Sequence, residues 1–185
     1  WSWGYAPSDT HDNEIAHNLV YDIGQEVLSD MGGIYTLGLS DGSTIHHNVF
    51  RDILCYPPGY GGWGIYFDEG TTHILAEKNL VYNTRTGSFH QHYGRENLFR
   101  NNILAFSERQ QLQRTRMEEH LSFTFERNIV YWSEGPLLGS NWSDDQYKLD
   151  HNLYWQVDGE EPTFAQWTLN EWKGRGQDAN SLVAD

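Results

Sequence analysis

Six asparagines recur along this chain at intervals of 23 to 31 residues, and each stands in the same short pattern. An apolar residue precedes each asparagine by three positions, and another apolar residue follows it directly. A repeat of this length, built from short strand-like segments without helical periodicity, is typical of a β-solenoid. We therefore predict an all-β fold, a parallel β-helix of about six turns. The repeated residues are Asn18, Asn48, Asn79, Asn102, Asn128 and Asn152.

Stacking between turns explains why asparagine is the residue that recurs. Successive turns of a β-solenoid lie about 4.8 Å apart, so a carboxamide can donate to one neighbour in its column and accept from the other. Such an asparagine ladder keeps the turns in register, and we assign it a structural role. Alternation with a period of two sends the preceding apolar residues into a shared interior. These residues are Ile15, Ile45, Phe99, Phe125 and Leu149.

The repeats are expected to occupy residues 1–155, and residues 156–185 are expected to form a C-terminal capping segment. Thr168-Leu-Asn-Glu171 has the spacing of a capping box, which predicts a short helix near 168–173 folded against the last turn. Residues 1–12 read as an incomplete turn, so we expect the native protein to extend further towards the N-terminus. An uncapped end exposes strand edges, which makes end-to-end self-association a candidate interaction.

Two insertions lengthen the first two intervals, at 24–31 and at 56–62. Insertions in repeat proteins map to one face, which is often the binding face. We therefore expect these two loops on the side of the molecule that carries the site.

Charge and composition narrow the choice of partner. The 185 residues include 12 basic and 26 acidic side chains, for a net charge of −14. This excess of negative charge disfavours nucleic acid and anionic membrane surfaces, and no apolar run approaches the roughly 20 residues of a membrane span. Aromatic residues make up 15% of the chain. Aromatic faces and carboxylates suit a neutral polysaccharide or oligosaccharide. The single Cys55 excludes an internal disulfide.

A second series of strands is expected between the asparagines, at 33–38, 64–69, 87–92 and 110–115. Equivalent residues of stacked turns share a face, so aligning the first residues of these strands predicts columns of side chains. The first column holds Tyr35, Tyr66, Phe89 and Leu112. The second, two positions on, holds Leu37, Asp68, Gln91 and Arg114. The third holds Gly38, Glu69, His92 and Thr115.

Carboxylates in these columns break the alternation of a packed core and indicate a site. Asp68 and Glu69 are candidate catalytic residues, because glycosidic cleavage uses one carboxylic acid and one carboxylate. In a regular strand these neighbours point to opposite faces, unless a turn at Gly70 brings Glu69 round. Asp30 is a third candidate. It lies roughly 20 Å from Asp68 in a straight strand and joins the site only if Gly32-Gly33 bends the chain.

Candidate substrate-binding residues surround these carboxylates. Aromatic side chains would form a wall on which sugar faces stack, and basic or imidazole side chains would orient hydroxyls or carboxylates. The stacking residues are Tyr35, Trp63 and Tyr66, and the orienting residues are His90, His92 and Arg114.

Other interpretations of the same residues remain open. Asp68 and Glu69 could form surface ion pairs with arginines at 114 and 116 and do no chemistry. His90 and His92 could hold a metal with Asp68, but they lack a recognised ligand spacing. We expect no metal and no cofactor.

Four segments together resemble bacterial right-handed parallel β-helix proteins of the pectin-lyase-like superfamily, and are most similar to their glycoside-hydrolase members. The resemblance implies a right-handed coil with acidic residues in one groove, and it carries over to Asp68 and Glu69, with Asp30 third. This chain differs from full-length members of that superfamily in lacking their N-terminal turns and their C-terminal β-domain. The segments are Asp30-Met-Gly-Gly-Ile-Tyr-Thr-Leu-Gly38, Gly62-Trp-Gly-Ile-Tyr-Phe-Asp-Glu-Gly70, Gly87-Ser-Phe-His-Gln-His-Tyr-Gly94 and Gln113-Arg-Thr-Arg116.

The expected function is therefore a glycoside hydrolase that cleaves a plant or bacterial polysaccharide with paired carboxylates in a lateral groove. We expect it in an extracellular or periplasmic compartment. One alternative is a polysaccharide lyase, in which Arg114 and Arg116 would neutralise a uronate carboxylate. Another is a solenoid fragment that binds a glycan without cutting it.

Overall fold

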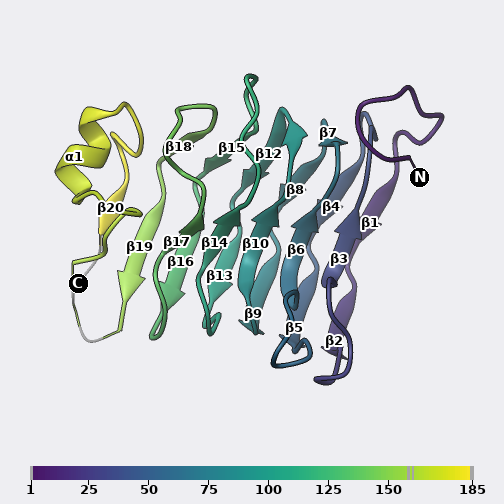
Figure 1. Ribbon diagram of the computed structural model, residues 1–185, viewed down its shortest axis with the longest axis horizontal. Coiled ribbons are helices and arrows are strands. Elements are labelled where there is room, and N and C mark those ends of the chain that lie inside the picture. The colour runs from purple at the N-terminus through teal and green to yellow at the C-terminus, as the bar shows by residue number, and fades with distance from the viewer. Residues whose placement is uncertain (1, 158, 160, 184–185) are drawn as a thin grey trace.

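The computed structural model describes residues 2–157, 159 and 161–183 and shows a parallel β-solenoid of about six turns (Figure 1). This confirms the fold expected from the asparagine repeat. Neighbouring strands of each sheet come from successive turns, so residues some 23 to 31 positions apart lie side by side. Among the described residues, no helix is both long and apolar enough to cross a membrane.

Three parallel sheets form the sides of the solenoid. The six-strand sheet contains β1 (Glu14–Ala16), β4 (Thr44–His46), β8 (Leu75–Glu77), β12 (Asn97–Arg100), β15 (Phe123–Glu126) and β18 (Lys148–Asp150). The seven-strand sheet contains β2 (Leu19–Ile23), β5 (Val49–Ile53), β9 (Leu80–Thr84), β13 (Ile103–Ala105), β16 (Ile129–Trp132), β19 (Leu153–Gln156) and β20 (Leu182–Val183). The five-strand sheet contains β3 (Gly32–Thr36), β6 (Trp63–Phe67), β10 (Gly87–Gln91), β14 (Leu112–Arg114) and β17 (Leu138–Ser140). A short pair, β7 (Thr71–Thr72) and β11 (Gly94–Arg95), lies beyond the five-strand sheet.

The asparagine ladder runs along the bend between the six-strand and seven-strand sheets. Each asparagine from Asn18 to Asn128 donates its backbone N–H to the Oδ1 of the next asparagine at 2.9–3.0 Å. Its Nδ2 donates to the same oxygen at 2.9–3.3 Å. The residue before each asparagine has a positive φ of 53–59°, which turns the chain sharply at this bend in every turn. The structural role predicted for the asparagines is confirmed.

The C-terminal segment closes the ladder. The predicted helix is present as α1 (Leu169–Gly174), and Thr168 and Glu171 form the expected capping box. The buried Asp178 accepts hydrogen bonds from Asn152 Nδ2 at 3.1 Å and from the indole of Trp172 at 2.8 Å. β20 then pairs with β19, so this segment also adds a strand to the seven-strand sheet. Within the expected cap of 156–185, residues 158, 160 and 184–185 lie outside the described residues.

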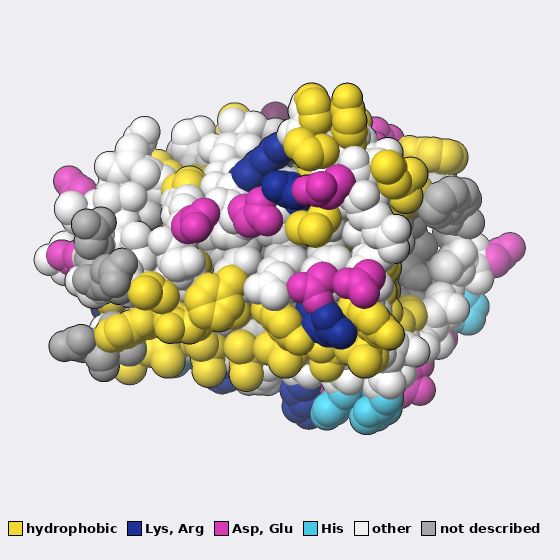
Figure 2. Space-filling view, turned by 90° about the horizontal axis from the view of Figure 1, so that it is seen from below, with side chains coloured by type: hydrophobic (Ala, Val, Ile, Leu, Met, Phe, Trp, Pro, Cys, Tyr) yellow, Lys and Arg dark blue, Asp and Glu magenta, His cyan; other side chains and the backbone are white. Residues whose placement is uncertain are grey.

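The two faces of the seven-strand sheet differ from the usual apolar-in, polar-out arrangement. Its inner face packs in the core, yet its outer face carries a second column of aliphatic side chains, one from each strand. Figure 2 shows a band of hydrophobic side chains that runs along the molecule. The column consists of Leu19, Val49, Leu80, Ile103, Ile129, Leu153 and Leu182.

Candidate functional site

A cavity of about 550 Å³ lies beside β6 and β10 and is open to solvent. Three carboxylates line it, and they are the three predicted from sequence: Asp30, Asp68 and Glu69. Five of the six predicted binding positions are at the cavity or in contact with its lining. Trp63, Tyr66, His90 and His92 line it directly. Tyr35 contacts both Tyr66 and Asp68.

The strand register differs by one residue from the predicted columns. Tyr35 pairs with Tyr66 as expected, but Tyr66 pairs with His90, and His90 pairs with Gln113. The prediction that Phe89 and Leu112 share the column of Tyr66 was therefore wrong. Both lie in the core beneath the sheet, because the strands keep their apolar residues on the inner face. The glycines Gly64 and Gly87, which guided the alignment, do not occupy equivalent positions.

Asp68 directly follows β6 and is only 6% exposed, although it lines the cavity. The Tyr35 hydroxyl donates to its Oδ2 at 2.5 Å. In the observed register, His92 and Thr115 replace Gln91 and Arg114 as its neighbours from the next two turns, and His92 Nδ1 lies 2.7 Å from Thr115 Oγ1. Asp68 therefore accepts a hydrogen bond from the Tyr35 phenol and shares its column with the His92 imidazole and the Thr115 hydroxyl.

Glu69 lines the same cavity as Asp68, despite being its neighbour in sequence. β6 ends at Phe67, so neither carboxylate belongs to the regular strand. Gly70 follows with a φ of +80°, which marks a sharp turn of the chain. The Tyr93 hydroxyl donates to Glu69 Oε2 at 3.4 Å. The objection that two adjacent carboxylates must face opposite ways does not hold here, since both lie where the strand has ended.

Asp30 reaches the cavity from the first insertion. The Tyr66 hydroxyl donates to its Oδ1 at 3.2 Å. The chain bends at Asp30 itself, whose φ is +52°, whereas Gly32 and Gly33 belong to β3. The expectation that the two glycines supply the bend was therefore wrong. Asp30 N–H donates to the Tyr60 carbonyl at 2.9 Å, which ties the first insertion to the second.

A stack of rings lies beneath the carboxylates. Tyr66 lies between Tyr35 and His90, with ring centroids 4.8 and 4.7 Å away, and Trp63 tilts against both Tyr66 and His90. Trp63 and Tyr66 are 2% and 4% exposed, so they form a mostly buried floor rather than an exposed wall.

Burial and the nearby carboxylates set the protonation of this stack. Burial, followed by the hydrogen bond to Asp68 and the charges of Asp68, Asp30 and Glu69, raises the pKa of Tyr35. Burial, then the charges of Asp68 and Asp30, raises the pKa of Tyr66 well above its usual range. Burial, then the charge of His92, lowers the pKa of His90. At neutral pH the two phenols therefore remain hydrogen-bond donors, and the His90 imidazole is uncharged.

Arg114 lies in the interior, away from the cavity. It pairs with Gln91 and Ser140 on the inward-facing column, and its side chain is 0% exposed. Its guanidinium forms two hydrogen bonds to the Asp144 carboxylate, at 2.8 and 3.1 Å. The one-residue shift of register accounts for the difference, because moving by one position turns a side chain to the other face. Asp68 and Glu69 accordingly have other partners than this arginine.

Other residues line the cavity that the sequence analysis did not select. Arg109 lines one side and donates to the carbonyls of Pro57 at 2.8 Å and Gly59 at 3.0 Å, which anchors the second insertion. Tyr60 comes from that insertion. Gln113 accepts from the Trp63 indole at 2.7 Å. The two insertions were a usable signal for this face, since Asp30 and Tyr60 lie on them. The part of the chain near Arg109 carried no comparable mark.

No protein-family model matches the chain, and neither a curated protein nor a solved structure shows significant similarity to it.

Proposed function

We propose that this protein is a glycoside hydrolase of the β-helical, pectin-lyase-like kind, which cleaves a plant or bacterial polysaccharide outside the cytoplasm. The observation that carries the proposal is the meeting of Asp30, Asp68 and Glu69 in one open cavity over an aromatic floor. Glycosidic cleavage needs two carboxyl groups beside the bond that breaks, one as acid and one as nucleophile or base. A lateral cavity on a solenoid gives a long substrate room to pass on either side.

The hydrogen bonds divide the roles between the carboxyl groups. Asp68 accepts a 2.5 Å hydrogen bond from the Tyr35 phenol, which orients it as a carboxylate and suits it to attack or to activate water. Glu69 meets the Tyr93 phenol at the longer distance of 3.4 Å, which leaves it freer to protonate the leaving oxygen. Asp30, held by Tyr66 at 3.2 Å, adds negative charge that stabilises a cationic, oxocarbenium-like transition state.

The polar lining fits a sugar chain. His90 lines the cavity, and its buried Nδ1 lacks a hydrogen-bond partner among the described residues. His90 Nε2 and His92 Nδ1 both lie within hydrogen-bond distance of Thr115 Oγ1, which orients the two rings. The net charge of −14 favours a neutral glycan over an anionic one.

A lyase is the second candidate, and one observation favours it: Arg109 lines the cavity and supplies a cation that could neutralise a uronate. The products separate the two reactions. A hydrolase releases reducing ends alone, whereas a lyase also creates an unsaturated sugar that absorbs in the ultraviolet. Both measurements are made on the same digests of neutral and uronate-containing polysaccharides.

Substitution of the carboxylates tests the proposal. Asp68→Asn and Glu69→Gln are expected to lower kcat by about 10²-fold or more, because each removes one of the two groups that the reaction uses. Asp9→Asn, at an exposed carboxylate outside the cavity, is the matched control and should retain full activity. Glycan binding that persists in Asp68→Asn, measured by calorimetry, shows that the cavity is intact. A wild-type protein that binds a glycan but never cuts it is a binding solenoid. A wild-type protein that neither binds nor cuts any of the neutral and uronate-containing polysaccharides refutes the proposal.

A further inference from the structure

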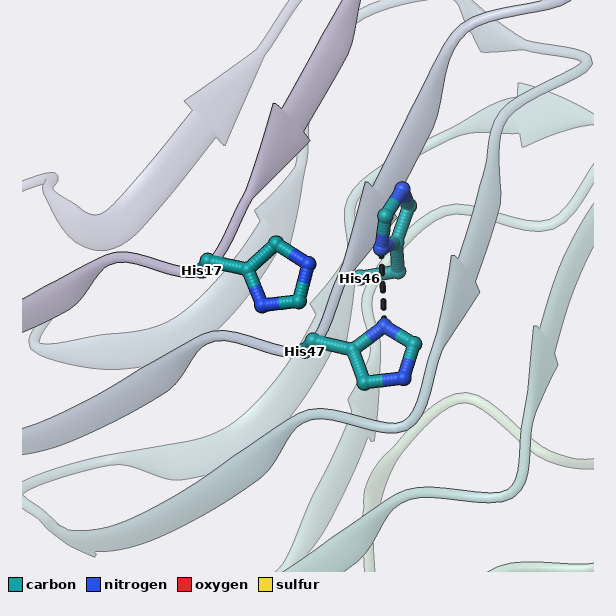
Figure 3. Close-up of side chains that lie close together, drawn as sticks. All are labelled: His17, His46 and His47. Atoms are coloured by element: carbon teal, nitrogen blue, oxygen red, sulfur yellow. Dashed lines mark hydrogen bonds between the residues drawn. The ribbon is translucent and has the colours of Figure 1, made fainter.

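Three histidines gather on the surface at the N-terminal end of the solenoid, away from the cavity. One nitrogen from each of His17, His46 and His47 can be chosen so that all three lie within 4.8 Å of one another. Figure 3 shows the rings converging, with a hydrogen bond between His46 Nδ1 and His47 Nδ1 at 2.8 Å. The His17 and His47 rings are stacked, with centroids 5.1 Å apart and planes 21° apart.

The coil itself brings these histidines together. His17 and His47 precede consecutive asparagines of the ladder and occupy the same sharp bend in adjacent turns, with φ of 59° and 53°. Equivalent residues of adjacent turns lie beside each other, so the two rings meet although 30 residues separate them. His46, the last residue of β4, directly precedes this bend. The cluster therefore spans the first two described turns.

A carboxylate holds one of the rings in a state suited to ligation. His46 Nε2 lies 2.9 Å from Glu14 Oε1, so this nitrogen donates its proton to the carboxylate. With the proton on Nε2, the Nδ1 lone pair of His46 is directed towards His47. A metal-ligating histidine usually donates its other ring N–H to such a carboxylate, which fixes the orientation of the ring.

Three imidazole nitrogens are ligands that favour a transition-metal ion. Neighbouring ligands at about 2.1 Å from an ion lie about 3.0 Å apart at a right angle and about 3.4 Å apart in a tetrahedron, so nitrogens within 4.8 Å of one another need only small ring movements to share an ion. His46 Nδ1 and His47 Nδ1 share a hydrogen bond at 2.8 Å, so an ion held by both nitrogens takes the place of the proton between them. Imidazole ligands select zinc, copper and nickel over magnesium and calcium, and among these divalent ions the general order of affinity places Cu²⁺ first.

We propose that His17, His46 and His47 bind one divalent transition-metal ion, with Glu14 behind His46, and that the ion joins the first two described turns of the solenoid. Because His17 comes from one turn and His46 and His47 from the next, the bound ion resists separation of β1 from β4. The proposal is independent of the carboxylate cavity and of glycan cleavage.

Titration of the metal-free protein with Cu²⁺ and with Zn²⁺ tests it. Calorimetry should show one ion per chain, bound more tightly for Cu²⁺ than for Zn²⁺. The electron paramagnetic resonance spectrum of the copper-loaded protein should show nitrogen ligands. The ion should raise Tm, because it binds the folded chain, in which the three rings are close together, in preference to the unfolded one.

Matched asparagine substitutions identify the ligands. Asparagine tolerates a positive φ, and Asn101 already occupies the equivalent bend with a φ of 53°, so His17→Asn and His47→Asn should fold normally. Each is expected to weaken binding at least tenfold and to abolish the rise in Tm. His151→Asn, at the same bend of a later turn, is the control and should leave both unchanged.

The opposite results overturn the proposal. Binding by wild type that is no tighter than binding by the His17→Asn/His47→Asn double variant would show that these histidines do not form the site. An equal loss in His151→Asn would point to nonspecific binding by surface histidines. Far-UV circular dichroism of each variant confirms that the solenoid is intact, so a loss of binding reports on ligation.

Discussion

Replacement of Asn102 by alanine tests the ladder where both of its neighbours are in place. The side chain is 1% exposed. Its Oδ1 accepts from the backbone N–H and the Nδ2 of Asn79, at 2.9 and 3.0 Å. Its Nδ2 donates to Asn128 Oδ1 and to the carbonyls of Ala76 and Arg100. Asn102→Ala removes all of these hydrogen bonds and inserts no replacement for any of them.

The expected loss follows from which groups are left unpaired. The buried N–H of Asn79 loses its acceptor, and an unsatisfied buried group costs about 1–3 kcal/mol. Asn79 Nδ2 keeps the Ile45 carbonyl, and Asn128 Oδ1 keeps the Asn102 N–H, so each of these loses one partner of two. Ordinary hydrogen bonds contribute about 1 kcal/mol each. The free energy of unfolding should fall by about 3–5 kcal/mol.

Asn18→Ala is the matched control, because Asn18 lies at the exposed end of the same column. Its Nδ2 donates to the Ala16 carbonyl and to Asn48 Oδ1. In Asn18→Ala, Asn48 Oδ1 still accepts from the backbone N–H of residue 18. Solvent can reach the groups that the substitution frees. The expected loss is below about 1 kcal/mol.

Urea titration followed by tryptophan fluorescence and circular dichroism measures both variants, and equal m values would show that the same surface is exposed. Hydrogen exchange of the Asn79 amide reports the local effect and should be faster in Asn102→Ala. Equal losses in the two variants would refute the reasoning. So would a loss under about 1 kcal/mol in Asn102→Ala with the Asn79 amide still protected.

Five further substitutions test the packing and the cap, and urea titration measures each. Arg114→Met should lower the free energy of unfolding by about 3 kcal/mol, because it leaves the Asp144 carboxylate without its cationic partner. No loss of stability would contradict the assignment of Arg114 to the interior. Gly64→Ala should cost about 1–3 kcal/mol, since its Cβ would lie 2.1 Å from a neighbouring methyl carbon, whereas Gly174→Ala, with open space around it, should stabilise α1 by about 0.5–1 kcal/mol. Thr168→Ala should cost about 1 kcal/mol as a lost cap. Hydrogen bonds from the Thr168 backbone and hydroxyl lower the pKa of Glu171 below 4.5. The stability that ionised Glu171 contributes is therefore present above pH 4.5 and is lost as the pH falls through the lowered pKa. Glu171→Gln should remove this pH dependence of stability, and an unchanged pH profile would contradict the assignment.

The asparagine spacing predicted the solenoid because its signal is local and repeated. Each turn has to return to the same bend, and the bend requires a carboxamide that bonds to the next turn. The capping box was equally readable, since Thr168 and Glu171 are three residues apart and contact each other directly. Both features depend on neighbours in the sequence or on a strict repeat, so one-dimensional information was enough to find them.

The column register was harder to predict. Gly64 and Gly87 looked equivalent in sequence, but the apolar face of β10 required Phe89 to point inwards. That single-residue shift moved His90 beside Tyr66 and turned Arg114 into the interior. Burial of apolar side chains is the stronger constraint, because reversing a strand would expose several of them at once.

The sequence by itself determined that this chain coils, that an asparagine ladder ties the turns together, and which three carboxylates were candidates. Only the tertiary structure decided that Asp30, Asp68 and Glu69 line one cavity, because their meeting depends on two bends, one at Asp30 and one after Phe67. It also decided that His17 meets His47 and that Arg114 stays inside. These contacts join residues of different turns, and a one-residue difference in register, which the sequence leaves open, changes which face each side chain occupies.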